Sequence, residues 1–348
     1  MEPLEQLTVP LLEWFRDNAR SLPWRDDPTP YHVWLSEIML QQTRVAAVLG
    51  YYRRFLEEAP DIAALAALPE DRLLKLWQGL GYYNRARNLQ RAARVIVEEY
   101  GGVFPADYAA VRALPGVGDY TAGAVCSIAF GQAAPAVDGN VLRVYARICG
   151  DGGDITAPRM KQKVTRAVGE IIPLNAAGTF NQALMELGAT VCLPNGAPLC
   201  QRCPAKGFCA ALAQGRVGEL PVKAPKKARR VEKRAVWLIF WENRVALRRR
   251  PDKGLLAGLW EFPNELGDGP LPPDWGIGAC SEEYGGQAKH IFTHMEWRMA
   301  IRLVRAASGV LPPGWVWAAA DELEKTYAVP NAFQRAVELA GEHLRGMD

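Results

Sequence analysis

Glu37 lies in a sequence context that suits proton transfer. In residues 30–43 its neighbours Trp34, Ile38 and Met39 have the spacing of one apolar face of a helix. A carboxylic acid among large apolar side chains is desolvated, which raises its pKa toward the value that a general acid needs near neutral pH. The spacing also allows Glu37 to face solvent, so both interpretations remain open.

Asp138 is a second carboxylate in a distinctive position. Gly139, Asn140 and a run of residues with helical spacing follow it directly. This position, shortly after a glycine turn, suits a reactive carboxylate. The same pattern is typical of a helix N-cap, so the sequence alone does not decide between the two roles.

A glycine turn precedes Asp138. Residues 114–123 read Leu-Pro-Gly-Val-Gly-Asp-Tyr-Thr-Ala-Gly, and an apolar-periodic run follows. Gly116 and Gly118 permit the positive φ angles of a tight turn, and the unpaired N–H groups of a following helix, at Thr121 among others, attract phosphate. The segment therefore predicts a DNA-binding helical hairpin at about residues 108–130, although a plain connection between two helices explains the glycines equally well.

Cysteine spacing indicates a metal centre in residues 192–209. Disulfides are rare inside cells, and four thiolates at this spacing can surround either a zinc ion or a 4Fe-4S cluster. The remaining cysteines stand singly among apolar residues and are expected to be buried: Cys126, Cys149 and Cys280. The four proposed ligands are Cys192, Cys200, Cys203 and Cys209.

The elements that must position these residues change in type along the chain. Helical spacing dominates the first part, which predicts an all-α region. Short β-rich stretches and a terminal helix predict an α+β region in the last third. The helical runs are residues 4–18, 31–50, 51–58, 71–80 and 86–100, with the hairpin and further runs up to 191; the later stretches are 235–241, 244–248, 297–304 and the helix 332–344.

Basic charge is concentrated between these regions. The chain carries +3 overall, yet residues 216–234 carry +6, which leaves −3 for the rest. Two prolines and no apolar period predict a linker there, either a solvated tether or a DNA contact. The predicted divisions are a catalytic region at 1–215, a basic linker at 216–231 and a second domain at 232–348.

Composition excludes other classes. The 348 residues are 49% hydrophobic, which is sufficient for two cores. No apolar run of membrane-spanning length and no signal-peptide pattern occur, so we expect a soluble protein of the cell interior that makes no membrane contact.

These motifs together resemble the helix-hairpin-helix DNA glycosylases, and closely the MutY family of adenine glycosylases. The resemblance covers essentially the whole chain and implies an all-α glycosylase domain with an iron–sulfur loop, followed by a smaller α+β Nudix-like domain. Further matching strings are Leu22–Arg25, Gly79–Tyr83, Phe180–Ala183, 254–263 and Phe292–His294.

The resemblance implies roles for the polar residues. Glu37 protonates adenine N7 and later activates water, while Asp138 stabilises or briefly captures the sugar cation. Tyr120 and Asn140 match positions that form hydrogen bonds in the site. The positions that match those around the extruded adenine are Trp24, Arg25 and Gln182.

The resemblance also implies DNA contacts and a cofactor. Gln42 and Tyr82 match positions that enter the base stack, beside the hairpin residues Gly116, Gly118 and Thr121. It favours 4Fe-4S over zinc, although seven residues separate Cys192 and Cys200 where six are usual. Recognition of 8-oxoguanine falls to Phe292, Thr293 and His294, where threonine replaces the usual serine.

The expected activity is excision of adenine opposite 8-oxoguanine, or less efficiently opposite guanine, in duplex DNA. We expect the protein to act as a monomer. We also expect it to lie in a bacterial-type cytoplasm, associated with the nucleoid.

Three alternative functions remain. An endonuclease III-like lyase needs lysine where this chain has Tyr120, and a non-catalytic lesion-binding protein needs no acid pair. A nucleotide pyrophosphohydrolase needs an Arg-Glu-x-x-Glu-Glu metal box, which the Trp260–Glu265 stretch does not supply.

Overall fold

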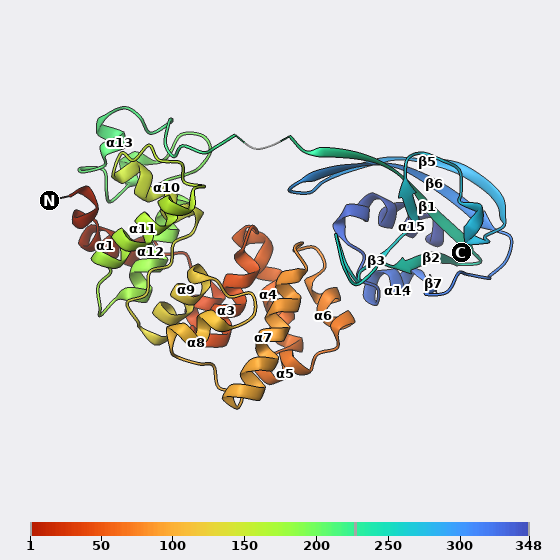
Figure 1. Ribbon diagram of the computed structural model, residues 1–348, viewed down its shortest axis with the longest axis horizontal. Helices are drawn as coiled ribbons and strands as arrows, with labels where there is room; N and C mark the ends of the chain where they lie inside the picture. The colour runs from red at the N-terminus through yellow and green to blue at the C-terminus, as the bar shows by residue number, and fades with distance from the viewer. Residues whose placement is uncertain (1, 226–227, 347–348) are drawn as a thin grey trace. The chain divides into compact units, whose positions relative to one another are not determined.

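The computed structural model describes residues 2–225 and 228–346, and the chain divides into two compact units. We call Met1–Ala67 with Asn88–Pro225 the helical unit, and Leu68–Arg87 with Lys226–Asp348 the C-terminal unit. The fold class expected from the sequence, a helical region followed by an α+β region, is confirmed (Figure 1). In the described part of the chain, no helix is long and apolar enough to cross a membrane.

The helical unit contains no strand among its described residues. The boundary between the units falls within α7 (Asn84–Tyr100). The other elements of this unit are η1 (Pro3–Gln6), α1 (Thr8–Asn18), α2 (Pro23–Asp26), α3 (Pro30–Leu40), α4 (Val45–Glu58), α5 (Ile62–Ala67), α8 (Tyr108–Ala113), α9 (Asp119–Phe130), α10 (Gly139–Ile148), α11 (Pro158–Ile171), α12 (Ala177–Thr190), η2 (Cys200–Arg202) and α13 (Ala210–Ala213).

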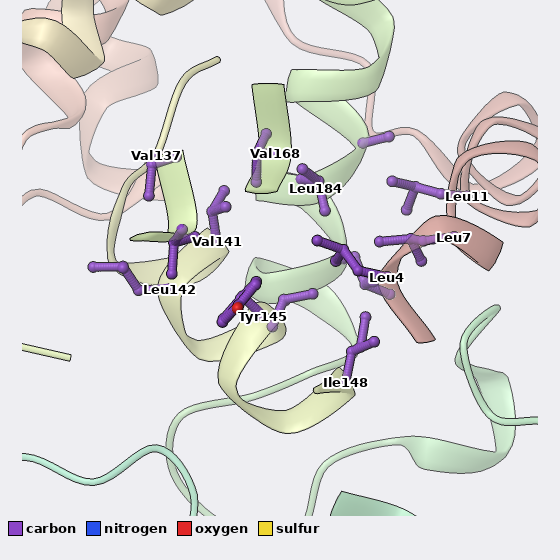
Figure 2. Close-up of a cluster of buried hydrophobic side chains, with 14 of the residues drawn as sticks. Leu4, Leu7, Leu11, Val137, Val141, Leu142, Tyr145, Ile148, Val168 and Leu184 are labelled. Carbon is purple, nitrogen blue, oxygen red and sulfur yellow. The ribbon is translucent and has the colours of Figure 1, made fainter. Parts of the chain in front are cut away.

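A hydrophobic core fixes the start of α10. Val137 and Val141, on either side of Asp138, are buried in a cluster that also includes Leu7 of the N-terminal segment and Leu184 of α12 (Figure 2). The flanking valines hold the backbone at Asp138 between packed helices, so the position of its Cα atom, from which the side chain extends, is fixed.

One predicted helix boundary is wrong. The sequence suggested a helix over residues 31–50 and another from residue 51, but α3 ends at Leu40 and α4 runs through Gly50. The break lies where Gln42 adopts a φ of 59°, a left-handed conformation that a continuous helix cannot contain. Gly50 fits within α4 because a helix tolerates an isolated glycine at moderate cost.

The C-terminal unit is built on a mixed sheet of order β3-β2-β1-β6-β5, in which β1 and β6 run parallel. β4 pairs with β1, and β7 pairs with β2. Its elements are α6 (Glu70–Trp77), β1 (Arg230–Trp241), β2 (Arg244–Arg249), β3 (Trp260–Glu261), β4 (Asn264–Leu266), η3 (Pro273–Trp275), β5 (Ala279–Ile291), β6 (Met295–Ala306), β7 (Trp315–Ala318), α14 (Ala320–Lys325), η4 (Asn331–Phe333) and α15 (Gln334–Arg345).

Alternation along the strands gives the sheet two different faces. On one face Val236, Trp297 and Ile301 pack with residues of α14 and α15. On the other face Trp237 and Val304 belong to a smaller core that the segment 271–277 partly covers. The helices therefore cover one face, while the second face is covered over only part of its length.

The strands extend beyond the predicted stretches. β1 begins at Arg230, and the backbone N–H of Arg230 donates to His294 O, so the predicted linker 216–231 runs into a paired strand. Residues 226 and 227 of that linker lie outside the described residues.

Among the single cysteines, Cys126 is buried and Cys149 is partly buried. Cys280 is exposed, contrary to expectation, because it lies on β5, which has β6 as a partner on one side only.

Candidate active site

Glu37 lies on the buried side of α3 and is only 6% exposed. The hydroxyl of Tyr120, from the first turn of α9, donates to Glu37 Oε2 at 2.5 Å. Burial raises the pKa of Glu37 to about 7; the negative charge of Asp138 adds to this rise, and the hydrogen bond from Tyr120 opposes it. A carboxyl group with that pKa can both donate and accept a proton near neutral pH.

Asp138 is the N-cap of α10 and also faces the same cavity as Glu37. Its Oδ1 accepts from the backbone N–H groups of Asn140 and Val141 at 2.9 and 2.8 Å, and its Oδ2 accepts from Asn140 Nδ2 at 2.7 Å. Burial raises the pKa of Asp138, while these hydrogen bonds and the charge of Arg143 act against the rise. The capping role and a site role therefore coexist.

A cavity of about 950 Å³ in the helical unit brings the predicted residues together. All four predicted catalytic residues and all three predicted adenine-pocket residues line it, together with Gln42. These lining residues are Glu37, Tyr120, Asp138, Asn140, Trp24, Arg25 and Gln182. The cavity is large enough for a purine base and its sugar, and it carries two carboxylates with different surroundings.

Glu186 is a cavity residue that the sequence analysis missed. Its carboxylate is 1% exposed and accepts from Arg20 Nε at 2.5 Å and Arg25 Nη2 at 2.9 Å. Burial raises the pKa of Glu186, but the bonds from the two arginines outweigh it and hold that pKa below its usual value. Arg25 Nε also donates to Gln182 Oε1, so Arg25 is fixed from two sides. The sequence does contain an indication of this pairing, because Glu186 is a single acidic residue in an apolar helical run. A buried carboxylate in such a run needs a basic partner.

Arg143 is a second residue that the sequence analysis missed. It is buried and donates to Asn140 Oδ1 at 2.9 Å, to Gly188 O at 2.7 Å and to Cys192 O at 2.8 Å. A Cβ on Gly188 would lie 2.5 Å from Asn140 Cβ, so only glycine allows α12 this close to α10. Arg143 thus connects the side chain that holds Asp138 with the start of the cysteine loop.

The helical hairpin comprises α8 and α9. Gly116 has a φ of 76°, and a Cβ there would lie 2.6 Å from Asn88 Cβ, so both conformation and space require glycine. The expectation of positive φ is wrong for Gly118, whose φ is −101° because it serves as the N-cap of α9. Thr121 is 2% exposed, and its hydroxyl accepts from Gln41, so its side chain faces inward.

Gln42 and Tyr82 share an unusual backbone. Their φ angles are 59° and 49°, in the left-handed region that side chains other than glycine rarely occupy. Strained backbone of this kind clusters at functional sites. Gln42 is exposed and borders the cavity of the helical unit, whereas Tyr82 is 49% exposed in the C-terminal unit.

The predicted recognition residues form the turn between β5 and β6. Phe292 packs against Trp297 with ring centroids 4.8 Å apart, and its N–H donates to Met295 O, which closes the turn. Thr293 and His294 remain exposed. Within the same unit, the hydroxyls of Tyr82 and Thr293 lie 2.8 Å apart in a hydrogen bond.

The four loop cysteines line one small cavity with apolar residues of α10 and α12. Arg147 Nη1 donates to Cys192 Sγ at 3.3 Å. Burial, reinforced by the other sulfurs, raises the pKa of the Cys203 thiol to about 12, so this thiol needs a cationic centre to ionise near neutral pH. Within the described residues no group of three or more side chains closes on a single ion. Four sulfurs facing one apolar cavity fit the donor set of a 4Fe-4S cluster.

The carboxylates after Gly254 are held by arginines. Glu261 is 2% exposed and paired with both Arg248 and Arg250, and Glu265 pairs with Arg248 at 3.2 Å. These ion pairs connect β2 and the segment after it to β3 and β4. They give the two glutamates a structural role in this unit.

The hairpin, the buried acid and the capped aspartate place the helical unit among base excision DNA glycosylases. In agreement, residues 35–170 match the family model of the HhH-GPD superfamily base excision DNA repair proteins, and residues 235–339 match that of the NUDIX domain. A solved thermostable thymine-DNA glycosylase aligns at a TM-score of 0.56 and 28% identity, covering 61% of this chain and 97% of that one.

More particularly, the chain belongs to the adenine DNA glycosylase family. It is 34% identical to the adenine DNA glycosylase of Mus musculus over 97% of this chain and 78% of the relative. The adenine DNA glycosylase of Buchnera aphidicola subsp. Schizaphis graminum (strain Sg) is 36% identical, covering 73% of each. The family expected from the sequence is therefore confirmed, and with it the assignment as an enzyme.

Proposed function

We propose that the protein excises adenine paired with 8-oxoguanine, and less efficiently adenine paired with guanine, by hydrolysing the N-glycosidic bond in duplex DNA. The observation that carries the proposal is the pair Glu37 and Asp138, two carboxylates in one cavity with different hydrogen-bond partners. Family membership supports adenine as the base removed.

Glu37 acts as the general acid. Adenine leaves readily only when a ring nitrogen is protonated, since the neutral base is a better leaving group than its anion. Because its pKa is raised to about 7, Glu37 can carry a proton near neutral pH and transfer it to N7. The resulting carboxylate then takes a proton from the attacking water. Tyr120 holds Oε2 and so orients the acid.

Asp138 acts on the sugar. Loss of the base leaves an oxocarbenium-like centre, which an adjacent carboxylate stabilises or briefly captures. Two backbone N–H groups and Asn140 hold Asp138 in place, so little reorganisation is needed when positive charge develops.

The reaction ends at an abasic site. Strand cleavage by this class of enzyme requires an amine that forms a Schiff base with the sugar. Tyr120, which occupies the lysine position of the lyases, has no amine. The protein is therefore proposed to be a monofunctional glycosylase that produces alkali-sensitive sites.

Recognition of the partner base is assigned to the turn Phe292–His294. Adenine is a normal base, so its own pocket cannot supply specificity and the opposite base must be read. Thr293 and His294 offer exposed donors and acceptors for 8-oxoguanine. Gln42 and Tyr82 would enter the base stack to compensate for the extruded adenine.

The four loop cysteines are proposed to hold a 4Fe-4S cluster. Such a cluster would supply a rigid anchor for residues 192–209 and would take no direct part in removal of the base. Cys192 O is bonded to Arg143, so the anchored loop supports the helix start at Asp138. We further propose that the protein acts as a monomer on nucleoid DNA in the cytoplasm.

A single-turnover assay tests this function. Duplexes carry adenine opposite 8-oxoguanine, guanine or thymine, and products are resolved with and without alkali. We expect alkali-dependent cleavage of the 8-oxoguanine pair first and the guanine pair second. Glu37→Gln and Asp138→Asn should each abolish product while retaining duplex binding.

Three results would count against the proposal. Alkali-independent nicking would assign lyase chemistry to the protein in spite of Tyr120. Equal excision opposite all three bases would remove the basis for a recognition turn. Hydrolysis of oxidised nucleoside triphosphates by the wild-type protein would instead favour a pyrophosphohydrolase.

A further inference from the structure

Three cations lie in one row across the sheet of the C-terminal unit. Lys233 of β1 pairs in register with Arg298 of β6, and Arg298 pairs in register with Lys289 of β5. Side chains of directly paired residues point to the same face, and neighbouring strands lie about 4.8 Å apart. Lys233, Arg298 and Lys289, which we call the basic row, therefore span about 10 Å on one face. All three residues are exposed.

The basic row lies on the face of the sheet that carries the smaller core, but outside that core. Ala235 lies two residues after Lys233 on the same face of β1, and it begins the smaller core that segment 271–277 partly covers. Around the row itself the structure instead has a hollow of about 450 Å³ with Gln287 and Ala300 in its lining. A hollow with cations in the place of apolar residues fits an anionic, solvated occupant.

The position of the row favours DNA as that occupant. Lys289 and Arg298 stand on the two arms of the β5–β6 hairpin whose turn is Phe292–His294. A duplex read by that turn would have its phosphates close to the hairpin arms.

Acidic groups near the row leave it net positive. Glu296 bonds Arg298 at 2.8 Å, and Asp268 also lines the hollow. Lys233 and Lys289 have no ion-pair partner within 4.0 Å among the described residues. These two lysines are thus the groups available to a phosphate.

We propose that the basic row binds the phosphate backbone of the DNA strand that the β5–β6 turn reads. This inference rests on the proposed function for the identity of the strand, but the binding chemistry is independent of excision. Each lysine that contacts a phosphate releases counterions, so binding should weaken with salt in proportion to the number of contacts.

The test compares full-length wild type with the double variant Lys233→Gln/Lys289→Gln. The probe is a duplex with 8-oxoguanine opposite 2′-fluoro-2′-deoxyadenosine, whose fluorine slows loss of the base. Affinity is measured by fluorescence anisotropy over a series of salt concentrations. We expect the slope of log affinity against log salt to become shallower by about 2.

Lys325→Gln/Arg345→Gln is the matched control, because it removes two positive charges from α14 and α15, which cover the other face. Its slope should equal that of the wild type. An unchanged slope in Lys233→Gln/Lys289→Gln, with an unchanged circular dichroism spectrum, would overturn the proposal. Binding of a nucleoside triphosphate that depends on both lysines, without a change in the duplex slope, would also overturn it.

The two proposals fail separately. Adenine excision with an unchanged salt slope rejects only the basic row. A shallower slope in a protein that removes no adenine rejects only the proposed reaction.

Discussion

The cavity of the helical unit, proposed to be catalytic, and the proposed recognition turn of the C-terminal unit hold their polar groups in opposite ways. In the cavity Glu37 and Glu186 are almost fully buried, and Asp138 accepts three hydrogen bonds. In the turn Thr293 and His294 are exposed, and the bond between Thr293 and Tyr82 is a contact between two exposed side chains.

The difference fits the roles proposed for the two regions. Groups that stabilise a developing charge act best when they are already fixed and dehydrated, so that no reorganisation occurs during the reaction. Groups that read a base must stay open until DNA supplies their partners. Removing one partner should therefore have large effects in the cavity and small effects at the turn.

Glu186→Gln should cause the largest change. The substitution leaves Arg20 and Arg25 without the carboxylate that they share, and breaking a buried ion pair costs about 3–5 kcal/mol. We expect a clear fall in the thermal unfolding temperature of the helical unit, measured by circular dichroism. Asp17→Asn, which removes an exposed carboxylate from the Arg16 pair, should leave that temperature unchanged. Equal effects of the two variants would contradict the comparison.

Arg143→Gln should lower activity more than stability. Hydrogen bonds from a charged group contribute about 1.5–3 kcal/mol, which corresponds to a loss of roughly tenfold to 150-fold in rate if it is expressed at the transition state. The single-turnover excision rate should fall by at least tenfold, because Asn140 loses the donor that fixes it beside Asp138.

A double-mutant cycle makes this prediction specific. Asn140→Ala should add little to Arg143→Gln if both act through Asp138. Full additivity would show that Arg143 affects the reaction by another route, such as the cysteine loop.

The pH dependence of excision should report the cavity acid. Because burial raises the pKa of Glu37 to about 7, the protonated fraction falls as the pH rises through that value. The single-turnover rate should therefore decrease about tenfold per pH unit well above pH 7. Tyr120→Phe removes a hydrogen bond that lowers this pKa, so the decline should begin at a higher pH. If the rate of Tyr120→Phe declines over the same pH range as that of the wild type, the titrating group is not Glu37.

Local patterns predicted the elements around the cavity better than those around the turn. The helix that carries Glu37, the hairpin and the N-cap Asp138 each depend on residues close in sequence, and the structure has all three. Glu186 and Arg143 were missed because most of their partners come from distant parts of the chain, Arg20 and Arg25 for Glu186 and residues 188 and 192 for Arg143. Which buried charge pairs with which depends on packing between segments far apart in the chain.

β5 was missed for a related reason. Its first half, Ala279–Tyr284, is exposed throughout and shows no apolar alternation. Pairing with β6 determines this strand, and such a contact leaves no local pattern. The assignment of Leu68–Arg87 to the C-terminal unit likewise depends on distant contacts, among them Gln78 Nε2 donating to Val329 O at 2.8 Å.

Tyr82→Phe should produce the smallest effect. The change removes the hydroxyl that bonds Thr293 and keeps the ring that is proposed to enter the base stack. A hydrogen bond between neutral, exposed groups contributes about 0.5–1.5 kcal/mol, so affinity for a duplex with 8-oxoguanine should fall by no more than about tenfold. Thr293→Val removes the same bond from the other side, and the double variant should be no weaker than the weaker single variant. A much larger loss in Tyr82→Phe would mean that the hydroxyl contacts DNA directly, and the recognition turn would then be as finely positioned as the catalytic cavity.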